Sequence, residues 1–593
     1  MVLRLAVIAA TCLLAACSGQ PPGPGEPAPR SPDDTARAGE AFAELLADHW
    51  DLRMAEDPIL AEQLGDSRGR GRLPDPSLAA YEAGIDARRE LLRRLGAIDP
   101  SHLGRAAALN YRLLRRELRD DIAAVEHNGK YLTMTTYWSP HLAAVRIAER
   151  ARLRSEADVA SYLGRLAGID DYLEAATARL DEAVELGWTQ PCEAMVGFER
   201  TYRTHIVKDP AQSVFFAPLE ASDRVSETQR AEARKLIRRE IVPAFKAFAA
   251  FYEERYKPNC RKRAGVGSLP GGDEFYAQAA RSYTTTQLSP DEIHELGLSE
   301  VARIRAEMVS AAKRAGFESL PAFQEHLRTS PEYYPQTAED RLEKASRIAK
   351  RIDGKLVGLF TRLPRMPYDV RPIPADIAEG TTTAYYSRPA ADGSRAGTYW
   401  VNTTKLGSRP LYELEALTLH EAVPGHHLQI ALMQELDLPE FRRFGGFTAF
   451  TEGWALYAER LGLEIGFFAT PQTDFGRLSY EMWRACRLVV DTGIHTKGWS
   501  RDDAIAFMLE NTGLSRANIE REVDRYITWP AQALAYKIGE LKIRELRARA
   551  EDALGEDFDL RRFHDAVLAN GALPLNILDE EISAWIEAGA DAS

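Results

Sequence analysis

The sequence predicts a mainly α-helical, multi-helix protein that carries one small β hairpin. Apolar residues recur at helical spacing in segments such as IVPAFKAFAAFYEERY (241–256) and DRLEKASRIAKRIDGKLVGLF (340–360). A helix start is indicated at 289–292, where serine can cap, proline fits the first turn and glutamate can close a capping box. Only between about 364 and 405 does the residue pattern become strand-like.

The composition limits the classes of protein that fit. With 593 residues, the chain can form more than one domain or one large helical body. Its hydrophobic content of 45% and charged content of 27% are ordinary for a globular protein. The formal net charge of −13 argues against a nucleic acid partner, because nucleic acid binding needs a basic surface.

The first 17 residues, MVLRLAVIAATCLLAAC, form an export signal. One arginine, Arg4, precedes an apolar run that is too short to span a membrane. The run ends in LAAC, which resembles a bacterial lipobox. We therefore expect residues 1–16 to be a signal peptide that is removed, and Cys17 to be lipidated and to anchor the protein to a membrane. A plain signal peptide with an incidental cysteine is the alternative.

Residues 17–37 are predicted to be an extended tether. They contain the Pro/Gly-rich stretch SGQPPGPGEPAPRSPDD (18–34). Serine, not aspartate, follows Cys17. By resemblance to Gram-negative lipoproteins, this indicates an exported lipoprotein on the periplasmic face of the outer membrane.

The rest of the chain is divided into a helical N-terminal region (38–285) and a C-terminal region (286–593). An exported protein resides where disulfides persist. Cys192 and Cys260 both lie beside prolines in predicted loops, so they are the expected disulfide pair, whereas Cys486 lies among apolar residues and is expected to be a buried thiol.

The strand-like stretch TTTAYYSRPAADGSRAGTYWVNT (381–403) predicts the hairpin. A Gly/Asp/Ser turn separates two runs rich in threonine and aromatic residues. The second run, GTYWVNT, could pair with an extended peptide. A simple hairpin strand is the equally good alternative.

The stretch HEAVPGHH begins at His420 and looks like an interrupted metal-binding helix. Two histidines at i and i+4 of a helix share one face and can hold zinc, with the glutamate between them holding a water. On an unbroken helix, His426 would lie about 9 Å along the axis from His420, and His427 about 10.5 Å. Neither could share one zinc ion with His420, because Zn–N bonds are about 2.0–2.1 Å.

Pro424 and Gly425 could interrupt the helix and bring the histidines closer together. Proline has no N–H for the carbonyl of His420, and glycine permits backbone conformations that other residues avoid. If the pair forms a bulge, the remaining string His-Glu-Ala-Val-His has the standard spacing. We therefore expect His426 to be the second ligand, with His427 as the alternative.

Glu452 is the expected third ligand. It lies in FTAFTEGWALYAERL (447–461), where apolar and aromatic residues surround it. A buried carboxylate is costly unless it meets a cation. The alternative is a surface glutamate paired with Arg460. Glu459 is expected to be exposed or to lie behind the ligands.

These motifs resemble those of known zinc peptidases. His420-Glu421 with a downstream Glu-Gly-x-Ala-x-Tyr from Glu452 looks like the gluzincins, whose ligands are His, His and Glu. The fuller set HEAVPGHHLQ, FTEGWALYAE, RLVVDTGIH and QALAYKIGELKI, behind a lipobox, resembles the bacterial lipoproteins of domain of unknown function family 885. The resemblance implies a mostly helical, zincin-like body with the hairpin beside the active-site helix. Residues 286–593 would then be a zinc-binding catalytic region.

The expected chemistry follows from these roles. Zinc on its three ligands can lower the pKa of a bound water to about 7, and Glu421 can accept the proton and pass it to the leaving amine. The oxyanion needs a further donor, for which the candidates are His427, His495 and Tyr536. Candidates for binding a substrate carboxylate are Arg487 and Lys537.

The sequence therefore predicts a zinc-dependent metallopeptidase, a hydrolase that trims short peptides in the cell envelope. The nearest alternative is a zinc amidase that acts on cell-wall peptides. A non-catalytic envelope binding lipoprotein is the alternative from another class, although such a protein has no use for Glu421 as a base. The sequence carries no indication of oligomeric state.

Overall fold

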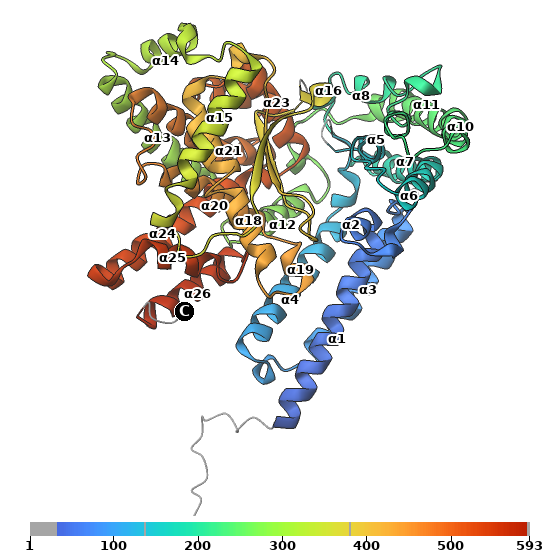
Figure 1. Cartoon of the computed structure of the whole chain (residues 1–593), viewed down its shortest axis with the longest axis horizontal. Helices are drawn as coiled ribbons and strands as arrows, with labels where there is room; N and C mark the ends of the chain where they lie inside the picture. Colours follow the sequence, from blue (N-terminus) through green and yellow to red (C-terminus); the bar gives the residue numbers. More distant parts are fainter. Residues whose placement is uncertain (1–31, 136–137, 379–380, 590–593) are drawn as a thin grey trace, which may run out of the picture.

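The computed structural model describes residues 32–135, 138–378 and 381–589, and it is mainly helical (Figure 1). The signal peptide, Cys17 and most of the predicted tether lie outside these residues. The first helix begins at Pro32, so residues 32–37, which were assigned to the tether, are helical. Within the described ranges, no helix is long and apolar enough to cross a membrane.

The chain begins with helices that pack along the main body. These helices are α1 (Pro32–Glu56), α2 (Pro58–Gln63), α3 (Leu78–Gly96) and α4 (Arg105–Glu126). Their apolar residues, such as Phe42 and Leu118, belong to the same hydrophobic core as Phe450 and Leu546 near the other end of the sequence. The predicted boundary at residue 285 therefore does not separate two cores.

A second group of helices has a core of its own, built from residues between Met134 and Tyr256. It forms the lobe on the right of Figure 1. Its helices are α5 (Pro140–Glu149), α6 (Glu156–Ala167), α7 (Ile169–Glu185), α8 (Arg200–Arg203), α9 (Ala217–Glu220), α10 (Glu227–Leu236) and α11 (Val242–Phe251).

The main body starts with α12 (Gly272–Thr284), α13 (Pro290–Arg314), α14 (Leu320–Thr329) and α15 (Ala338–Asp353). The predicted capping box at the start of α13 is confirmed: the Ser289 hydroxyl accepts from the Glu292 N–H, and the Glu292 carboxylate accepts from the Ser289 N–H. α15 ends seven residues earlier than the apolar pattern indicated, where Gly354 follows Asp353.

The predicted hairpin is confirmed and belongs to a three-stranded sheet. β2 (Ala384–Ser387) pairs antiparallel with β3 (Gly397–Val401), and β1 (Tyr368–Pro372) pairs parallel with the other side of β3. A short helix, α16 (Ala375–Ala378), connects β1 to β2. Because β3 has a neighbour on both sides, the expectation that GTYWVNT pairs with a peptide is wrong; β1 and β2 are the strands at the two edges.

The remaining helices complete the body around α21, whose residues from Phe475 to His495 are all buried. Such a helix must bury its polar groups too, and six of them (Arg477, Glu481, Arg484, Arg487, Asp491 and His495) follow one stripe at three- and four-residue spacing. The helices are α17 (Leu414–Glu421), α18 (His426–Glu435), α19 (Glu440–Arg443), α20 (Thr448–Leu461), α21 (Pro471–Thr496), α22 (Arg501–Asn511), α23 (Arg516–Thr528), α24 (Ala535–Leu554), α25 (Leu560–Leu568) and α26 (Leu575–Glu587).

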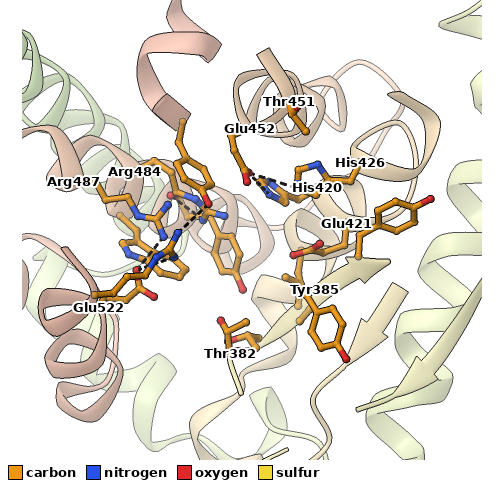
Figure 2. A pocket seen from close by; sticks show the side chains of 18 of the residues that line it. Thr382, Tyr385, His420, Glu421, His426, Thr451, Glu452, Arg484, Arg487 and Glu522 are labelled. Carbon is orange, nitrogen blue, oxygen red and sulfur yellow. Dashed lines mark hydrogen bonds and ion pairs between the residues drawn. The ribbon is translucent and has the colours of Figure 1, made fainter. Parts of the chain in front are cut away.

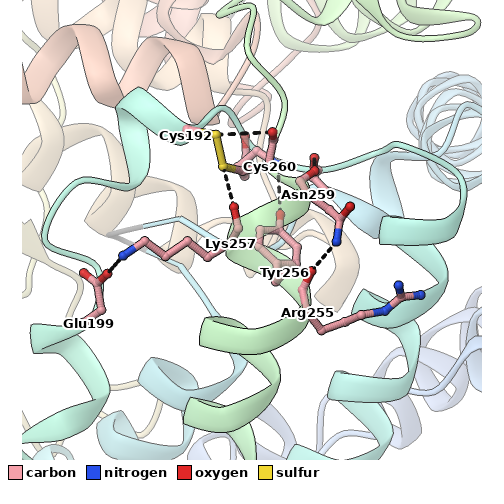
Figure 3. Close-up of a disulfide and its surroundings, with 9 residues drawn as sticks. Cys192, Glu199, Arg255, Tyr256, Lys257, Asn259 and Cys260 are labelled. Carbon is pink, nitrogen blue, oxygen red and sulfur yellow. Dashed lines mark hydrogen bonds and ion pairs between the residues drawn. A yellow bond between two sulfur atoms is a disulfide. The ribbon is translucent and has the colours of Figure 1, made fainter.

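The predicted disulfide between Cys192 and Cys260 is present, and Cys486 is a buried free thiol (Figure 3). The bond joins two segments that also hydrogen-bond to each other through their backbones. The Cys192 N–H donates to the Arg261 carbonyl, and the Arg261 N–H donates to the Gln190 carbonyl. It therefore closes the second lobe near the point where the chain leaves it.

Replacing both Cys192 and Cys260 with serine is expected to lower the free energy of unfolding by about 2–4 kcal/mol. The reason is that the cross-link spans 68 residues and restricts the unfolded chain. Urea unfolding without reductant would measure the change. Reductant should destabilise the natural protein by a similar amount and leave the double variant unaffected; equal stability of the two proteins without reductant would contradict the prediction.

Candidate functional site

The stretch HEAVPGHH forms a break between two helices. α17 ends at Glu421 and α18 begins at His426, so the chain does not form the expected single helix with a bulge. The His427 N–H donates to the Ala422 carbonyl at 3.0 Å, which closes the intervening residues into a short loop. The Trp454 indole of α20 donates to the Pro424 carbonyl at 2.8 Å and holds this loop in place.

Gly425 is required by a close approach of two backbones. A Cβ atom there would lie 1.9 Å from the carbonyl oxygen of His420 and 2.4 Å from that of Leu419. The φ and ψ angles of Gly425 are −72° and −128°; this ψ lies outside the usual helical and extended ranges, in line with the backbone freedom that the sequence suggested. The absence of a side chain lets α18 start directly against the end of α17.

Substituting alanine for Gly425 is expected to destabilise the protein by about 2–3 kcal/mol, because the Cβ can be accommodated only if the helix ends move apart. Chemical denaturation would measure this loss. Gly407→Ala is the matched control: no atom lies within 4 Å of its added Cβ, and the expected change is within about 0.5 kcal/mol. Similar effects of the two substitutions would contradict the argument.

The break brings His420, His426 and Glu452 together. One potential ligand atom from each lies within 4.8 Å of the others. The Glu452 Oε2 atom is 3.6 Å from Nε2 of His420 and 3.5 Å from Nε2 of His426. Hydrogen bonds are shorter, at 2.7–3.2 Å, whereas two tetrahedral zinc ligands lie about 3.3–3.6 Å apart.

The electrostatic surroundings of these three residues, here called the triad, favour a bound cation. Glu452 Oε2 is buried and has no hydrogen-bond partner among the described residues. Burial lowers the pKa of His420, but the carboxylates of Glu452 and Glu459 on its two sides outweigh that effect and raise the pKa to about 9. Burial raises the pKa of Glu452, yet the two histidines hold it well below its usual value. The residues therefore fit a bound metal ion.

Glu459 supports the triad from behind. Its Oε1 atom lies 2.8 Å from Nδ1 of His420, so the imidazole can donate to the carboxylate while Nε2 faces Glu452. Of the two roles expected for Glu459, the exposed one is wrong, because the side chain is buried. A carboxylate on the far nitrogen is the usual arrangement for a metal-binding histidine.

A close crossing of two helices positions Glu452. A Cβ atom on Gly453 of α20 would lie 2.5 Å from Gly539 of α24, so only glycines allow this approach. Glu452 precedes Gly453 on α20, and Tyr536 lies about one turn before Gly539 on α24. The close crossing therefore brings both side chains to the same cavity. Tyr457 in the same motif has a packing role, since its hydroxyl meets Nε2 of His564 at 2.8 Å.

The triad lines a cavity of about 360 Å³ (Figure 2). This is within the range of small-ligand sites. The lining comes from strand β2 and the residues before it, from α17 and α18 on either side of the helix break, and from α20, α21, α23 and α24. The lining residues are Thr382, Thr383, Ala384, Tyr385, Tyr386, Leu417, His420, Glu421, His426, Ile430, Thr451, Glu452, Tyr480, Trp483, Arg484, Arg487, Glu522, Arg525 and Tyr536.

Glu421 lies in this cavity beside the triad, where the sequence placed the base. Its side chain is buried, and burial raises the pKa of its carboxyl. Tyr536 and Arg487 also line the cavity, so three of the predicted catalytic and substrate-binding residues meet at one place.

His427 points away from the cavity. Its Nε2 atom lies 3.0 Å from the Met366 carbonyl oxygen, to which it can donate, and its Nδ1 atom lies 2.9 Å from the Tyr386 hydroxyl, from which it can accept. Burial lowers its pKa to about 4, so the ring is neutral. The structure therefore favours His426 as the second ligand. It does not support the prediction that His427 contacts substrate, because His427 does not line the cavity. Tyr386, the hydrogen-bond partner of His427, does line it.

His495 and Lys537 are also outside the cavity, contrary to their predicted roles. Both ring nitrogens of His495 bind backbone groups, at the Val266 N–H and the Tyr526 carbonyl. The ammonium group of Lys537 is fully buried and makes ion pairs of 2.8–3.0 Å with Glu300, Glu481 and Glu540. The polar atoms of both side chains are therefore already bonded to groups on or around α21.

Several cavity residues were missed by the sequence analysis. They are Tyr385 and Tyr386 of β2, Arg484 of α21, and Glu522 and Arg525 of α23. The polar stripe of α21 could have indicated Arg484, which is three residues before Arg487 in that stripe. Glu522 and Arg525 carried no comparable signal, because charged pairs at this spacing are common on helix surfaces.

The fold and the site define a helical protein with a His₂Glu cluster that lines a cavity. This chain belongs to the DUF885 family, described as a bacterial protein of unknown function, which matches residues 58–582. Among curated proteins, no sequence matches this chain.

Two solved structures are similar over most of their length. A candidate lipoprotein of Colwellia psychrerythraea is 27% identical, with a TM-score of 0.85 over 94% of this chain and 99% of that one. A candidate lipoprotein of unknown function from Shewanella oneidensis is 19% identical, with a TM-score of 0.72 over 92% of this chain and 99% of that one, and shows the fold alone.

Proposed function

We propose that this protein is a zinc-dependent metallopeptidase that hydrolyses short peptides. The observation that carries the proposal is the position of Glu452 Oε2, which lies 3.6 Å from Nε2 of His420 and 3.5 Å from Nε2 of His426. These distances are about those between two zinc ligands, and the oxygen has no hydrogen-bond partner among the described residues. The zincin-like character of the fold is part of this proposal. Histidine and carboxylate ligands are typical of catalytic zinc, which polarises a carbonyl and acidifies a water.

The chain's own residues would supply the proton transfers. Glu421 is buried beside the triad and makes no ion pair within the described residues, so its carboxylate is available to take a proton from water and deliver it to the departing amine. The phenol of Tyr536 lines the same cavity and can donate to a developing oxyanion. A binding protein without catalysis would have no use for a buried carboxylate at the position of Glu421.

We further propose that the protein acts as an exported lipoprotein on the periplasmic face of the outer membrane. The support is the lipobox-like ending at Cys17 and the similarity to two candidate lipoproteins. The disulfide between Cys192 and Cys260 fits an oxidising compartment.

The deciding experiment combines metal analysis with product analysis. We expect about one zinc per chain in the purified protein, and hydrolysis of a mixed peptide pool that a chelator abolishes and added zinc restores. Mass spectrometry identifies the products, and peptidoglycan fragments tested in parallel separate a peptidase from an amidase of the cell wall. Less than about 0.2 zinc per chain, with no hydrolysis after zinc is added, would refute the proposal.

A further inference from the structure

Three arginines form one end of the cavity. They are Arg484 and Arg487 of α21 and Arg525 of α23, here called the arginine wall. Figure 2 shows Arg484 and Arg487 to the left of the triad and Glu421 below His420 and His426. The wall is therefore separate from the group that would move protons.

Within ion-pair distance, the three guanidinium groups of the arginine wall meet only two carboxylates of the described residues, Glu522 and Glu459. Arg487 and Arg525 share a single carboxylate, Glu522, at 3.0 Å and 3.7 Å. Within the described residues neither has another ion-pair partner. Arg484 shares Glu459 with His420, at 3.5 Å and 2.8 Å. Burying more guanidinium groups than carboxylates is costly unless an anion joins them.

The wall also has hydrogen-bond donors to spare. Nη1 of Arg487 and Nε of Arg484 are buried and have no hydrogen-bond partner in the part of the chain that the structure describes. The Arg487 side chain is only 3% exposed. Its guanidinium is held by Glu522, by the Tyr526 hydroxyl at 3.0 Å and by the face of Tyr536 at 4.3 Å. A guanidinium fixed in this way places positive charge beside the cavity, which favours an anionic ligand there.

The arginine wall lies beside the residues that would hold the metal, so an anion bound there would be part of the substrate. Arg484 and His420 contact the same carboxylate, Glu459, so the wall begins beside the metal-binding residues. Arg525 is its most accessible member, with 18% of its side chain exposed, and its Nη2 lies 3.4 Å from the Tyr536 hydroxyl. A carboxylate is the anion that peptides carry, either at the C-terminus or on an acidic side chain, and arginine recognises it through paired hydrogen bonds.

We propose that the arginine wall binds the free C-terminal carboxylate of the peptide, so that cleavage occurs near that end. This inference rests on the proposed function. The C-terminus is favoured over an acidic side chain because the rings of Tyr480, Trp483 and Tyr536 pack against the guanidinium groups of the wall and line the cavity beside them. A peptide chain that ends at the wall need not continue past these rings. The protein is then a carboxy-terminal exopeptidase.

The test compares three versions of one neutral peptide with the zinc-loaded full-length protein: free acid, C-terminal amide, and amide with a glutamate near the end. We expect kcat/KM for the free acid to exceed that for the plain amide by about 10- to 100-fold, the usual effect of hydrogen bonds to a charged group. The glutamate should not restore the rate. Equal hydrolysis of all three would overturn the inference and leave the peptidase proposal standing; rescue by glutamate would assign the wall to side chains.

Binding provides a second measurement that does not depend on turnover. In the Glu421→Gln background, calorimetry should show about 10- to 100-fold tighter binding of the free acid than of the amide. Adding Arg525→Gln should abolish this preference, whereas Arg516→Gln, on the exposed part of the same helix, should retain it. A preference that survives Arg525→Gln would overturn the assignment to the wall. Failure of the proposed function looks different: no peptide is hydrolysed and the metal is absent.

Discussion

Replacing Glu421 with glutamine is expected to lower peptide hydrolysis by about 10³-fold while zinc stays bound. Glutamine has the same shape but cannot take a proton, and general base catalysis typically contributes 10²–10⁴-fold. Glu421 lies in the cavity but is not one of the three residues whose ligand atoms converge, so its loss should not remove the metal. Steady-state kinetics and metal analysis of the same sample would measure both effects.

The matched control for this change is Glu440→Gln on the surface helix α19, which also removes one negative charge. It should leave both the rate and the zinc content unchanged. A Glu421→Gln protein with an undiminished rate would show that this carboxylate is not the base. Loss of zinc together with the rate would instead show that Glu421 belongs to the metal site.

Exchanging His426 for alanine is expected to reduce zinc affinity by more than 100-fold. It removes one of three converging ligands, whereas loss of a group behind a ligand already costs 10–100-fold. The neighbouring variant His427→Ala should retain zinc, because the ring of His427 binds Met366 and Tyr386 and does not line the cavity. Equilibrium titration with a zinc indicator would compare the two variants.

The two histidines thus serve as controls for each other. The His427→Ala protein is expected to bind zinc normally but to lose some activity, since the Tyr386 hydroxyl loses its partner at the cavity wall. Zinc lost in His427→Ala and kept in His426→Ala would mean that the chain bends differently between α17 and α18. Such a result would also remove the geometric basis for the proposed function.

Local sequence patterns predicted a large part of the site. His420, Glu421, His426 and Glu452 were identified because residues suited to hold a metal and a water carry particular side chains at particular spacings in the sequence. In the structure they come from three helices, α17, α18 and α20. The capping box of α13, the β2–β3 hairpin and the Cys192–Cys260 pair are also local or compositional signals, and all three are present.

The predictions that failed concern residues whose roles depend on distant partners. Lys537 looked available to a substrate, but Glu300 and Glu481, which neutralise it, come from two other helices. His495 also looked available, but its Nδ1 atom accepts a hydrogen bond from the backbone N–H of Val266, which is 229 residues away in the sequence. No spacing within one helix reveals such a partner.

The sequence alone determined which side chains could hold a metal and activate water, because those roles depend on chemical type and short-range spacing. Only the tertiary structure decided which histidine faces Glu452, since that follows from the helix break against Trp454 and the close approach at Gly425. It also decided that Arg484, Arg487 and Arg525 form one wall, because α21 and α23 meet there through packing between distant parts of the chain.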